Sequence, residues 1–420
     1  MDVVISIKAS NTVIMVKTVR LLAHIMEKEG MHFPLHLGVT EDGEDGRIKS
    51  ALGIGALLAD GLGDTVRVSL SEAPEAEIPV ARKLVDYMTQ RRNHPYIPGA
   101  VAPEFHYLSP ERRTTTAVHN IGGENLPVVI AVRLDGNMDF NPQFTPDYVY
   151  AGRQLPEHPI KGMQYIIDAD LWNGQPDTWP AFKSEQLPFV SGFNASLKFL
   201  FISYMGLDDE AIACLKYHPE IVLVAQSIHP NRLGEYRALA HQLMNEGLKN
   251  PLVFFQHYAE DEVENLQIKS AADMGALIID GFCDGILLFN QSKQKGGKKI
   301  SDKVTDATAF GILQAGRVRT SKTEYISCPG CGRTLYDLES TIARIKQATS
   351  HLKGLKIGIM GCIVNGPGEM ADADYGYVGA GRGKISLYKK KECIEKNIPE
   401  EEAVEKLIEL IKKNGDYTER

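Results

Sequence analysis

An internal repeat restricts the fold of this 420-residue chain more than any other feature of its sequence. Residues 4–35 align without a gap with residues 221–252, and after a shift of three residues the alignment resumes between 48–61 and 268–281. In each copy, apolar runs of strand length alternate with amphipathic stretches of helical length, which is typical of parallel βα units. The repeat therefore predicts two strand–helix–strand–helix–strand segments. The aligned identities include Ser10 with Ser227, Arg20 with Arg237, Gly30 with Gly247 and Asp60 with Asp280.

The two copies differ in what precedes them. Before the second copy, further strands are predicted at 126–133, 146–151, 163–169 and 189–203, enough for a nearly complete eight-stranded barrel. The first copy has no such segment before it, so a barrel that it closes would lack about five of its eight βα units. Three parallel strands cannot close a barrel. We therefore expect a truncated barrel with an unpaired strand edge.

The ends of the predicted strands show where chemistry is expected. Active sites of such barrels lie at the C-terminal ends of the strands, which here carry Lys8, Thr40, Glu41, Arg67 and Ser69. We predict that the second barrel is a non-catalytic duplicate, because its side chains at these positions are apolar or aromatic. The aligned residues are Ala225, approximately Tyr258, Leu287 and Phe289.

The polar residues at the first three strand ends suit an anion. A lysine point charge, an arginine that binds through two nitrogens and a serine hydroxyl, converging from neighbouring strands, can hold a diphosphate. A structural role suits them equally, with Lys8 and Arg67 paired to Asp64 or Glu41 in the barrel mouth. The residues alone leave both interpretations open. His36, in the middle of a predicted strand, is expected to be packed in the barrel core.

Three cysteines near the C-terminus have the spacing of a metal site. Cys328 and Cys331 form a Cys-Pro-Gly-Cys turn, and Cys362 follows in the segment Gly-Cys-Ile-Val-Asn-Gly-Pro-Gly-Glu. Thiolates bind iron–sulfur clusters and zinc, and a CxxC turn brings two sulfurs to one centre. Three sulfurs leave one metal position open, which Glu369 could fill as a weak, displaceable ligand.

Zinc is the alternative at this site, since the CxxC pair with two further cysteines could form an all-thiolate tetrahedral centre. The spacing alone favours neither metal, but a Gly-Pro loop that ends in a carboxylate favours a cluster with one exchangeable iron. Cys393 lies in a charged segment and is expected to be a free thiol. Cys214 and Cys283 have no partner spacing and are expected to be small buried apolar residues.

The segments SCPGCGRTLYDL and GCIVNGPGE resemble the cluster-binding domain of the 4-hydroxy-3-methylbut-2-enyl diphosphate synthase family (IspG, also called GcpE) of the non-mevalonate isoprenoid pathway. The segments ISIKAS (5–10), PLHLGVTEDG (34–43) and KSALGIGALLADGLGDTVRVSL (49–70) resemble the closing part of that family's (β/α)8 barrel. The middle of the chain resembles the extra domain of the family's large, three-domain form.

The resemblance implies an α/β architecture with three domains. Residues 1–90 would be the last three βα units of a catalytic TIM barrel, which makes this barrel partial. Residues 91–313 would be a TIM-barrel-like insert domain. Residues 314–420 would be a small α+β domain that carries a [4Fe-4S] cluster, with a helix at 336–352, strands at 355–360 and 384–388, and a closing helix at 399–414.

The resemblance also implies a reaction, the two-electron reductive ring opening of 2-C-methyl-D-erythritol 2,4-cyclodiphosphate to 4-hydroxy-3-methylbut-2-enyl diphosphate and water. The cluster would be held by Cys328, Cys331, Cys362 and, weakly, Glu369. A ferredoxin or a flavodoxin would supply the electrons.

The same family carries over roles for the remaining site residues. Lys8, Arg67 and Ser69 would bind the diphosphate. Glu41 would donate a proton to the departing oxygen, and Asn365 would hold the substrate near the iron.

Composition agrees with an enzyme of a reducing, cytoplasmic compartment. Six cysteines in a chain of this length do not suggest a disulfide framework, and no apolar stretch approaches the ~20 residues that span a membrane. The net charge of −8 does not suggest a nucleic-acid partner. The sequence leaves the oligomeric state open, a homodimer included. Two other functions stay open: a cluster-bearing electron carrier or scaffold without turnover of its own, and a zinc-stabilised binding protein.

Overall fold

The computed structural model describes residues 3–39, 43–70, 72–291, 300–328, 334, 336–364 and 366–419. The chain divides into two compact units. One unit combines Met1–Asp86 with Thr320–Arg420, and the other is Tyr87–Arg319. In the part of the chain that the structure describes, no helix has the length and apolar character needed to cross a membrane.

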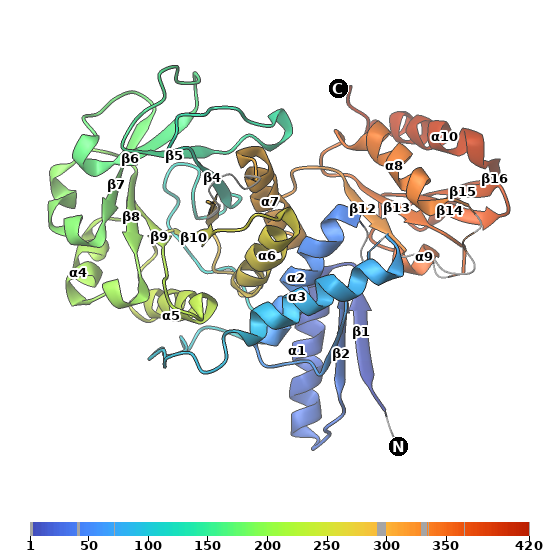
Figure 1. The fold of residues 1–420 in the computed structure, drawn as a ribbon, viewed down its shortest axis with the longest axis horizontal. Helices are drawn as coiled ribbons and strands as arrows, with labels where there is room; N and C mark the ends of the chain where they lie inside the picture. Colours follow the sequence, from blue (N-terminus) through green and yellow to red (C-terminus); the bar gives the residue numbers. More distant parts are fainter. Residues whose placement is uncertain are drawn as a thin grey trace. The chain divides into compact units, whose positions relative to one another are not determined.

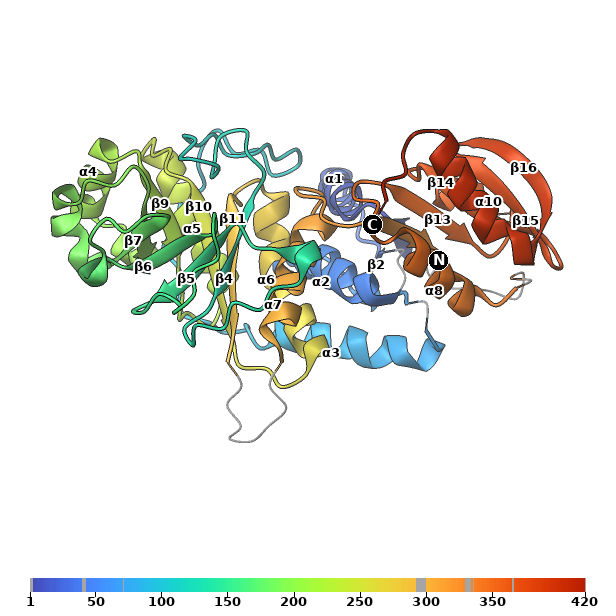
Figure 2. The ribbon, with the colours of Figure 1, turned by 90° about the horizontal axis from the view of Figure 1, so that it is seen from above.

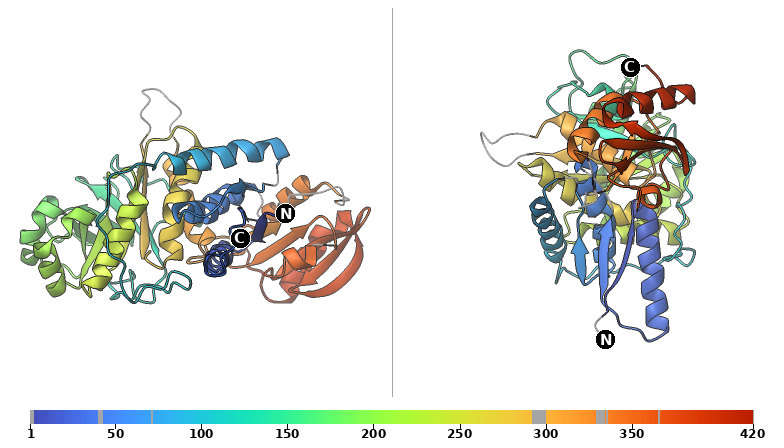
Figure 3. Two further views of the ribbon diagram at one scale, coloured as in Figure 1. Left: turned by 90° about the horizontal axis from the view of Figure 1, so that it is seen from below. Right: turned by 90° about the vertical axis from the view of Figure 1, so that its right-hand side faces the viewer.

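The N-terminal part of the first unit is a parallel sheet of three strands covered by helices (Figures 1 and 3). Asn11 begins the first helix, because its side chain accepts hydrogen bonds from the amides of Val13 and Ile14. The helices pack on the apolar face of the sheet, where Leu37 is fully buried. The elements are β1 (Ile5–Ala9), α1 (Thr12–Lys28), β2 (Leu35–Val39), α2 (Gly43–Ala59), β3 (Thr65–Arg67), a 3-10 turn (Pro74–Ala76) and α3 (Glu77–Thr89).

The C-terminal part of the same unit is a five-stranded mixed sheet in the order β12-β13-β14-β15-β16. The first three strands are parallel, and the last two pair antiparallel. A core that includes Ile345 of α8, Leu407 of α10 and Tyr377 of β14 joins the helices to the sheet. The elements are β12 (Glu324–Ser327), α8 (Leu338–Thr349), β13 (Lys356–Met360), α9 (Gly366–Glu369), β14 (Tyr375–Gly381), β15 (Lys384–Lys389), β16 (Glu392–Pro399) and α10 (Glu400–Lys413).

The second unit is a closed barrel of eight parallel strands, which can be followed in Figures 1 and 2. Apolar side chains from its strands form one buried core, to which Ile130, Phe199, Val253 and Leu287 belong. The strands are β4 (Val128–Val132), β5 (Tyr148–Gly152), β6 (Gln164–Asp168), β7 (Thr178–Lys183), β8 (Lys198–Ile202), β9 (Ile221–Ala225), β10 (Leu252–Tyr258) and β11 (Gly285–Asn290).

The connections of this barrel differ between its two halves. From β4 to β8 the strands are joined by loops and 3-10 helices (Pro142–Phe144, Ala169–Leu171 and Ser184–Gly192), and α-helices follow only from β8 onwards. Prolines in these connections, such as Pro156 and Pro159, disfavour α-helix because they lack the amide hydrogen. The later elements are a 3-10 turn (Tyr204–Gly206), α4 (Asp209–Tyr217), α5 (Arg232–Asn245), α6 (Val263–Ile279) and α7 (Asp302–Ala315).

The structure confirms the predicted fold class of a TIM-type barrel with a C-terminal α+β module, and corrects two strands of the closed barrel. The strand predicted at 189–203 is a 3-10 helix followed by β8, and β7 was not predicted. Pro180 lies inside β7, and a proline within an apolar run argues against a central strand because it cannot donate a ladder hydrogen bond.

The internal repeat is confirmed by matching contacts in the two copies. Arg20 Nε lies 2.9 Å from Asp60 Oδ2, and the aligned Arg237 Nε lies 2.9 Å from Asp280 Oδ2. The aligned glycines Gly30 and Gly247 both adopt positive φ, at 67° and 68°. Strands β1, β2 and β3 and the helices between them are therefore built in the same way as β9, β10 and β11 of the closed barrel.

Candidate functional site

A row of residues across the three-stranded sheet brings two cations together. Lys8 of β1 is in register with Gly38 of β2, which is in register with Arg67 of β3. Side chains at matched positions of neighbouring parallel strands point to the same face. A Cβ added at Gly38 would lie 3.5 Å from Lys8 Cε and 3.6 Å from the carbonyl oxygen of Arg67. A side chain at Gly38 would thus be in van der Waals contact with the Lys8 side chain.

The charges in this row influence one another. Partial burial, and then the Arg67 guanidinium, lower the pKa of Lys8, while Glu77 and Glu369 act in the opposite direction. Glu77 also accepts a hydrogen bond from the amide of Leu70 at 3.1 Å, which fixes the chain just after β3. The predicted residues Lys8 and Arg67 therefore lie together on one face of the sheet.

His36 was expected to be a packed core residue, and this prediction is wrong. The side chain is only half-buried and lies on the polar face, where Nδ1 is 2.7 Å from Thr65 Oγ1. Burial lowers the pKa of His36, and the neighbouring Lys8 and Arg67 lower it further. Strand alternation was the signal that could have found it, since His36 is two residues from Gly38 and so shares its face.

Ser69 lies two residues beyond Arg67, after the end of β3, and its side chain is buried at 5% exposure. Thr40 and Glu41, which follow β2, lie outside the described residues. Of the polar residues predicted at the strand ends, the structure therefore describes Lys8, Arg67 and Ser69, and not Thr40 or Glu41.

The cysteine loops follow two neighbouring parallel strands. Cys328 comes directly after β12, and Cys362 comes two residues after β13. Because β12 and β13 pair in parallel, both thiols lie at the same edge of the sheet. The amide of Gly361 donates a hydrogen bond to Cys328 Sγ at 3.2 Å. Cys331 and Asn365 lie outside the described residues.

Two glycines let the backbone close tightly around this edge. A Cβ at Gly361 would overlap Thr334 Oγ1, and a Cβ at Gly379 of β14 would overlap the carbonyl oxygen of Gly361. Side chains at either position would push the loops apart. The Gly361 amide reaches the Cys328 sulfur because both glycines lack a side chain.

Tyr336 contacts the same sheet edge. Its hydroxyl donates a hydrogen bond to the carbonyl oxygen of Met360 at 3.0 Å. Burial raises the pKa of Tyr336, and Tyr377 and the thiols of Cys328 and Cys362 raise it further. Tyr336 was not identified from the sequence as a site residue, although it belongs to the SCPGCGRTLYDL segment.

Glu369 ends the short helix α9 and is exposed. Its charge raises the pKa of Lys8, and both residues belong to one compact unit. Among the described residues, no group of three or more His, Cys, Asp or Glu side chains is assembled around a metal position. The predicted ligand set includes Cys331, which those residues do not contain.

Two family models match the parts of the chain that form this site. The GcpE TIM-barrel domain matches residues 1–82, and the GcpE protein C-terminal domain matches residues 324–413. A protein of Phocaeicola vulgatus is 72% identical over 422 residues, which are 100% of this chain and 68% of that protein.

The chain belongs to the GcpE family. A protein of Bacteroides fragilis is 76% identical over 421 residues, and one of Porphyromonas gingivalis is 46% identical over 422 residues. Each of these two alignments covers 100% of this chain and 66% of the relative, so the chain spans less than two thirds of their length. All three relatives are named 4-hydroxy-3-methylbut-2-en-1-yl diphosphate synthase (flavodoxin).

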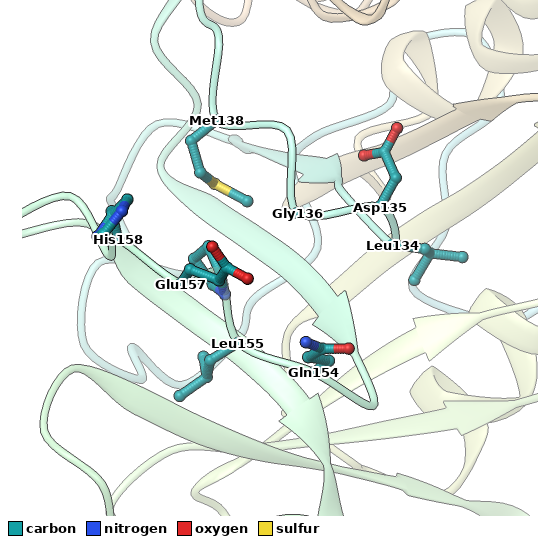
Figure 4. Close-up of a pocket in the computed structure, with 9 residues that line it drawn as sticks. Leu134, Asp135, Gly136, Met138, Gln154, Leu155, Glu157 and His158 are labelled. Atoms are coloured by element: carbon teal, nitrogen blue, oxygen red, sulfur yellow. The ribbon is translucent and has the colours of Figure 1, made fainter.

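The barrel of the second unit differs chemically at its strand ends. Ala225 and Leu287 are buried, and Phe289 packs against the barrel core. A pocket of about 500 Å³ lies beside the loops that follow β4 and β5 (Figure 4). Its nine lining residues include Asp135, Glu157 and His158 but neither Lys nor Arg. This pocket does not reproduce the cationic row of the first unit.

Proposed function

We propose that this chain carries two parts of an enzyme that reductively opens 2-C-methyl-D-erythritol 2,4-cyclodiphosphate. One is the cationic row of Lys8, Gly38 and Arg67, which would bind the diphosphate. The other is the thiol edge, the sheet edge with Cys328 and Cys362, which would bind the cluster. The product would be 4-hydroxy-3-methylbut-2-enyl diphosphate, with release of water. The observation that carries the proposal is the occurrence of both features in one compact unit, with Glu369 acting electrostatically on Lys8. Membership of the GcpE family supports the choice of reaction.

The residues at the thiol edge fit an iron–sulfur cluster. Cys328 and Cys362 offer soft sulfur ligands from adjacent strand ends, and the Gly361 amide donates to Cys328 Sγ, a kind of hydrogen bond that tunes cluster-bound sulfurs. Cys328, Cys331 and Cys362, with Glu369 as a weaker oxygen ligand, would hold a [4Fe-4S] cluster. When bound, such a cluster supplies single electrons of low potential, which no side chain can supply.

The chain's own residues bind and orient the substrate. Lys8 provides a point charge and Arg67 a two-nitrogen contact to the diphosphate, and Ser69 adds a hydroxyl donor. Gly38, in register between them, adds no side chain of its own. Glu41 would hold the proton that the departing oxygen takes, and Asn365 would orient the reacting end of the substrate.

The relatives' names point to the electron donor. Because the names of these relatives include the word flavodoxin, we propose a flavodoxin as the partner of this chain, with a ferredoxin as the alternative. Reduced thiols at the cluster edge require a reducing compartment, which supports the cytoplasm as the location.

Anaerobic reconstitution with iron and sulfide, followed by titration with the cyclic diphosphate, tests the proposal. The chain should take up iron and sulfide in equal amounts, and Lys8→Met with Arg67→Met should weaken binding of the cyclic diphosphate. Lys28→Met, at the exposed end of α1, is the matched control and should bind as the unaltered chain does. Stoichiometric zinc with no iron, or unchanged binding in the double variant, would contradict the proposal.

A further inference from the structure

A buried ion pair joins the two parts of the first unit. Lys49 Nζ lies 3.1 Å from Glu324 Oε1, although the residues are 275 positions apart in the chain. Lys49 lies on α2 and is 3% exposed, and Glu324 begins β12 and is 4% exposed. Removal of two charges from water offsets much of their attraction, but any arrangement that leaves one of them buried and unpaired is strongly disfavoured. Such a pair therefore selects one arrangement of the two segments.

The pair lies close in sequence to both halves of the candidate site. Glu324 precedes Cys328 by four residues, at the start of the strand that Cys328 follows. Lys49 lies on the helix that follows β2, the strand that carries Gly38. A displacement at the pair would therefore move the thiol edge relative to the cationic row.

The internal repeat shows that this long-range partner is specific to the first copy. Lys269 on α6 is aligned with Lys49, but it pairs with Glu260, nine residues away, at 2.6 Å. Lys269 also lies 5.7 Å from the ring centre of Tyr87, and its side chain is 31% exposed. Lys269 in the closed barrel thus pairs with a residue close in sequence, at a partly exposed place. Lys49, at the same position of the repeat, pairs with a buried residue far away in sequence.

We infer that Lys49 and Glu324 are positioning residues that fix how two modules of the first unit dock on each other. These are the C-terminal module, with strands β12 to β16, and the three-stranded module, with strands β1 to β3. Their docking role stands on the ion pair itself, and its consequence for catalysis rests on the proposed function. The pair holds the start of β12, the strand that Cys328 follows, against α2.

Hydrogen exchange of the full chain, measured by mass spectrometry, tests this role. Lys49→Met and Glu324→Gln should each speed amide exchange in β12 and α2 on the order of 100-fold, because each removes one member of the buried ion pair that joins them. The exchanged pair, Lys49→Glu with Glu324→Lys, should recover most of the protection. Lys269→Met is the matched control and should leave exchange in β12 and α2 unchanged.

Two results would overturn the inference. One is unchanged protection of β12 and α2 in both single variants, and the other is an exchanged pair no better protected than the single variants. Iron and sulfide content is measured in parallel and should stay equal in all variants, since none of them alters a thiol. A chain that binds no iron would refute the proposed function, while the exchange results would still decide the docking role.

Discussion

Gly38→Val should separate the stability of the three-stranded module from its ability to bind an anion. Gly38 lies in the middle of the cationic row, and a Cβ there would make only ordinary contacts, at 3.5 Å to Lys8 Cε and 3.6 Å to the Arg67 carbonyl. Glycine inside a strand costs about 0.5–1 kcal/mol relative to alanine, so a side chain here should leave the free energy of unfolding unchanged or raise it by up to that amount.

Anion binding should change in the opposite direction. The valine side chain would occupy the space between Lys8 and Arg67 and prevent both from contacting one anion. Loss of one hydrogen bond to a charged group costs about 1.5–3 kcal/mol, which corresponds to a dissociation constant roughly 10-fold to 150-fold higher.

Phosphorus NMR titration with inorganic pyrophosphate at low salt measures the binding, and thermal unfolding measures the stability. Ser6→Val is the control, because it places the same valine side chain on the same face of the sheet, two residues before Lys8 along β1. Pyrophosphate binding that is unaffected by Gly38→Val would show that the anion does not bind between Lys8 and Arg67. A large loss of stability would show that the space is needed for packing.

Three further predictions concern the cluster, the pH dependence and the extent of the barrel. Cys328→Ser, Cys331→Ser and Cys362→Ser should each abolish assembly of a cluster of about four irons and four sulfides. Cys393→Ser should keep the cluster, and Glu369→Gln should keep it in an oxygen-sensitive form. Absorption spectra and iron analysis under anaerobic conditions measure each outcome. The folded-state pKa of His36 is lowered, so near and below about pH 6.5 the unfolded chain binds more protons than the folded chain. The free energy of unfolding should therefore fall as the pH decreases through this value. Urea unfolding at several pH values measures this fall, which His36→Gln should reduce. The 420 residues alone, which span 66% of the Bacteroides fragilis relative, should turn over the cyclic diphosphate slowly or not at all, because β1 to β3 supply few donors for a diphosphate. Addition of the part of that relative that this chain does not span should restore turnover, and full activity without it would show that the three-stranded sheet suffices.

Local patterns were enough to predict β1, β2, β3 and β13, but not β12, which Cys328 follows. The repeat follows from aligned residues such as Arg20 and Arg237, whose ion pairs the structure finds in both copies. The positions of Lys8, Arg67 and Cys362 at strand ends follow from apolar runs that end close to them. These features are local because the alternation of strand and helix is written in short, consecutive stretches of sequence.

Other features required the tertiary structure, because they depend on contacts between distant segments. β7 contains Pro180, and β14 is rich in glycine, so neither has the local composition of a strand, yet both are held by neighbouring strands on each side. The Gly361 amide contacts Cys328, 33 residues away, and Lys49 contacts Glu324, 275 residues away. The sequence by itself therefore determined that Lys8, Arg67 and Cys362 stand at strand ends. Only the fold decided which residues share one face and one edge, since that depends on how strands pair and on which charges are buried together.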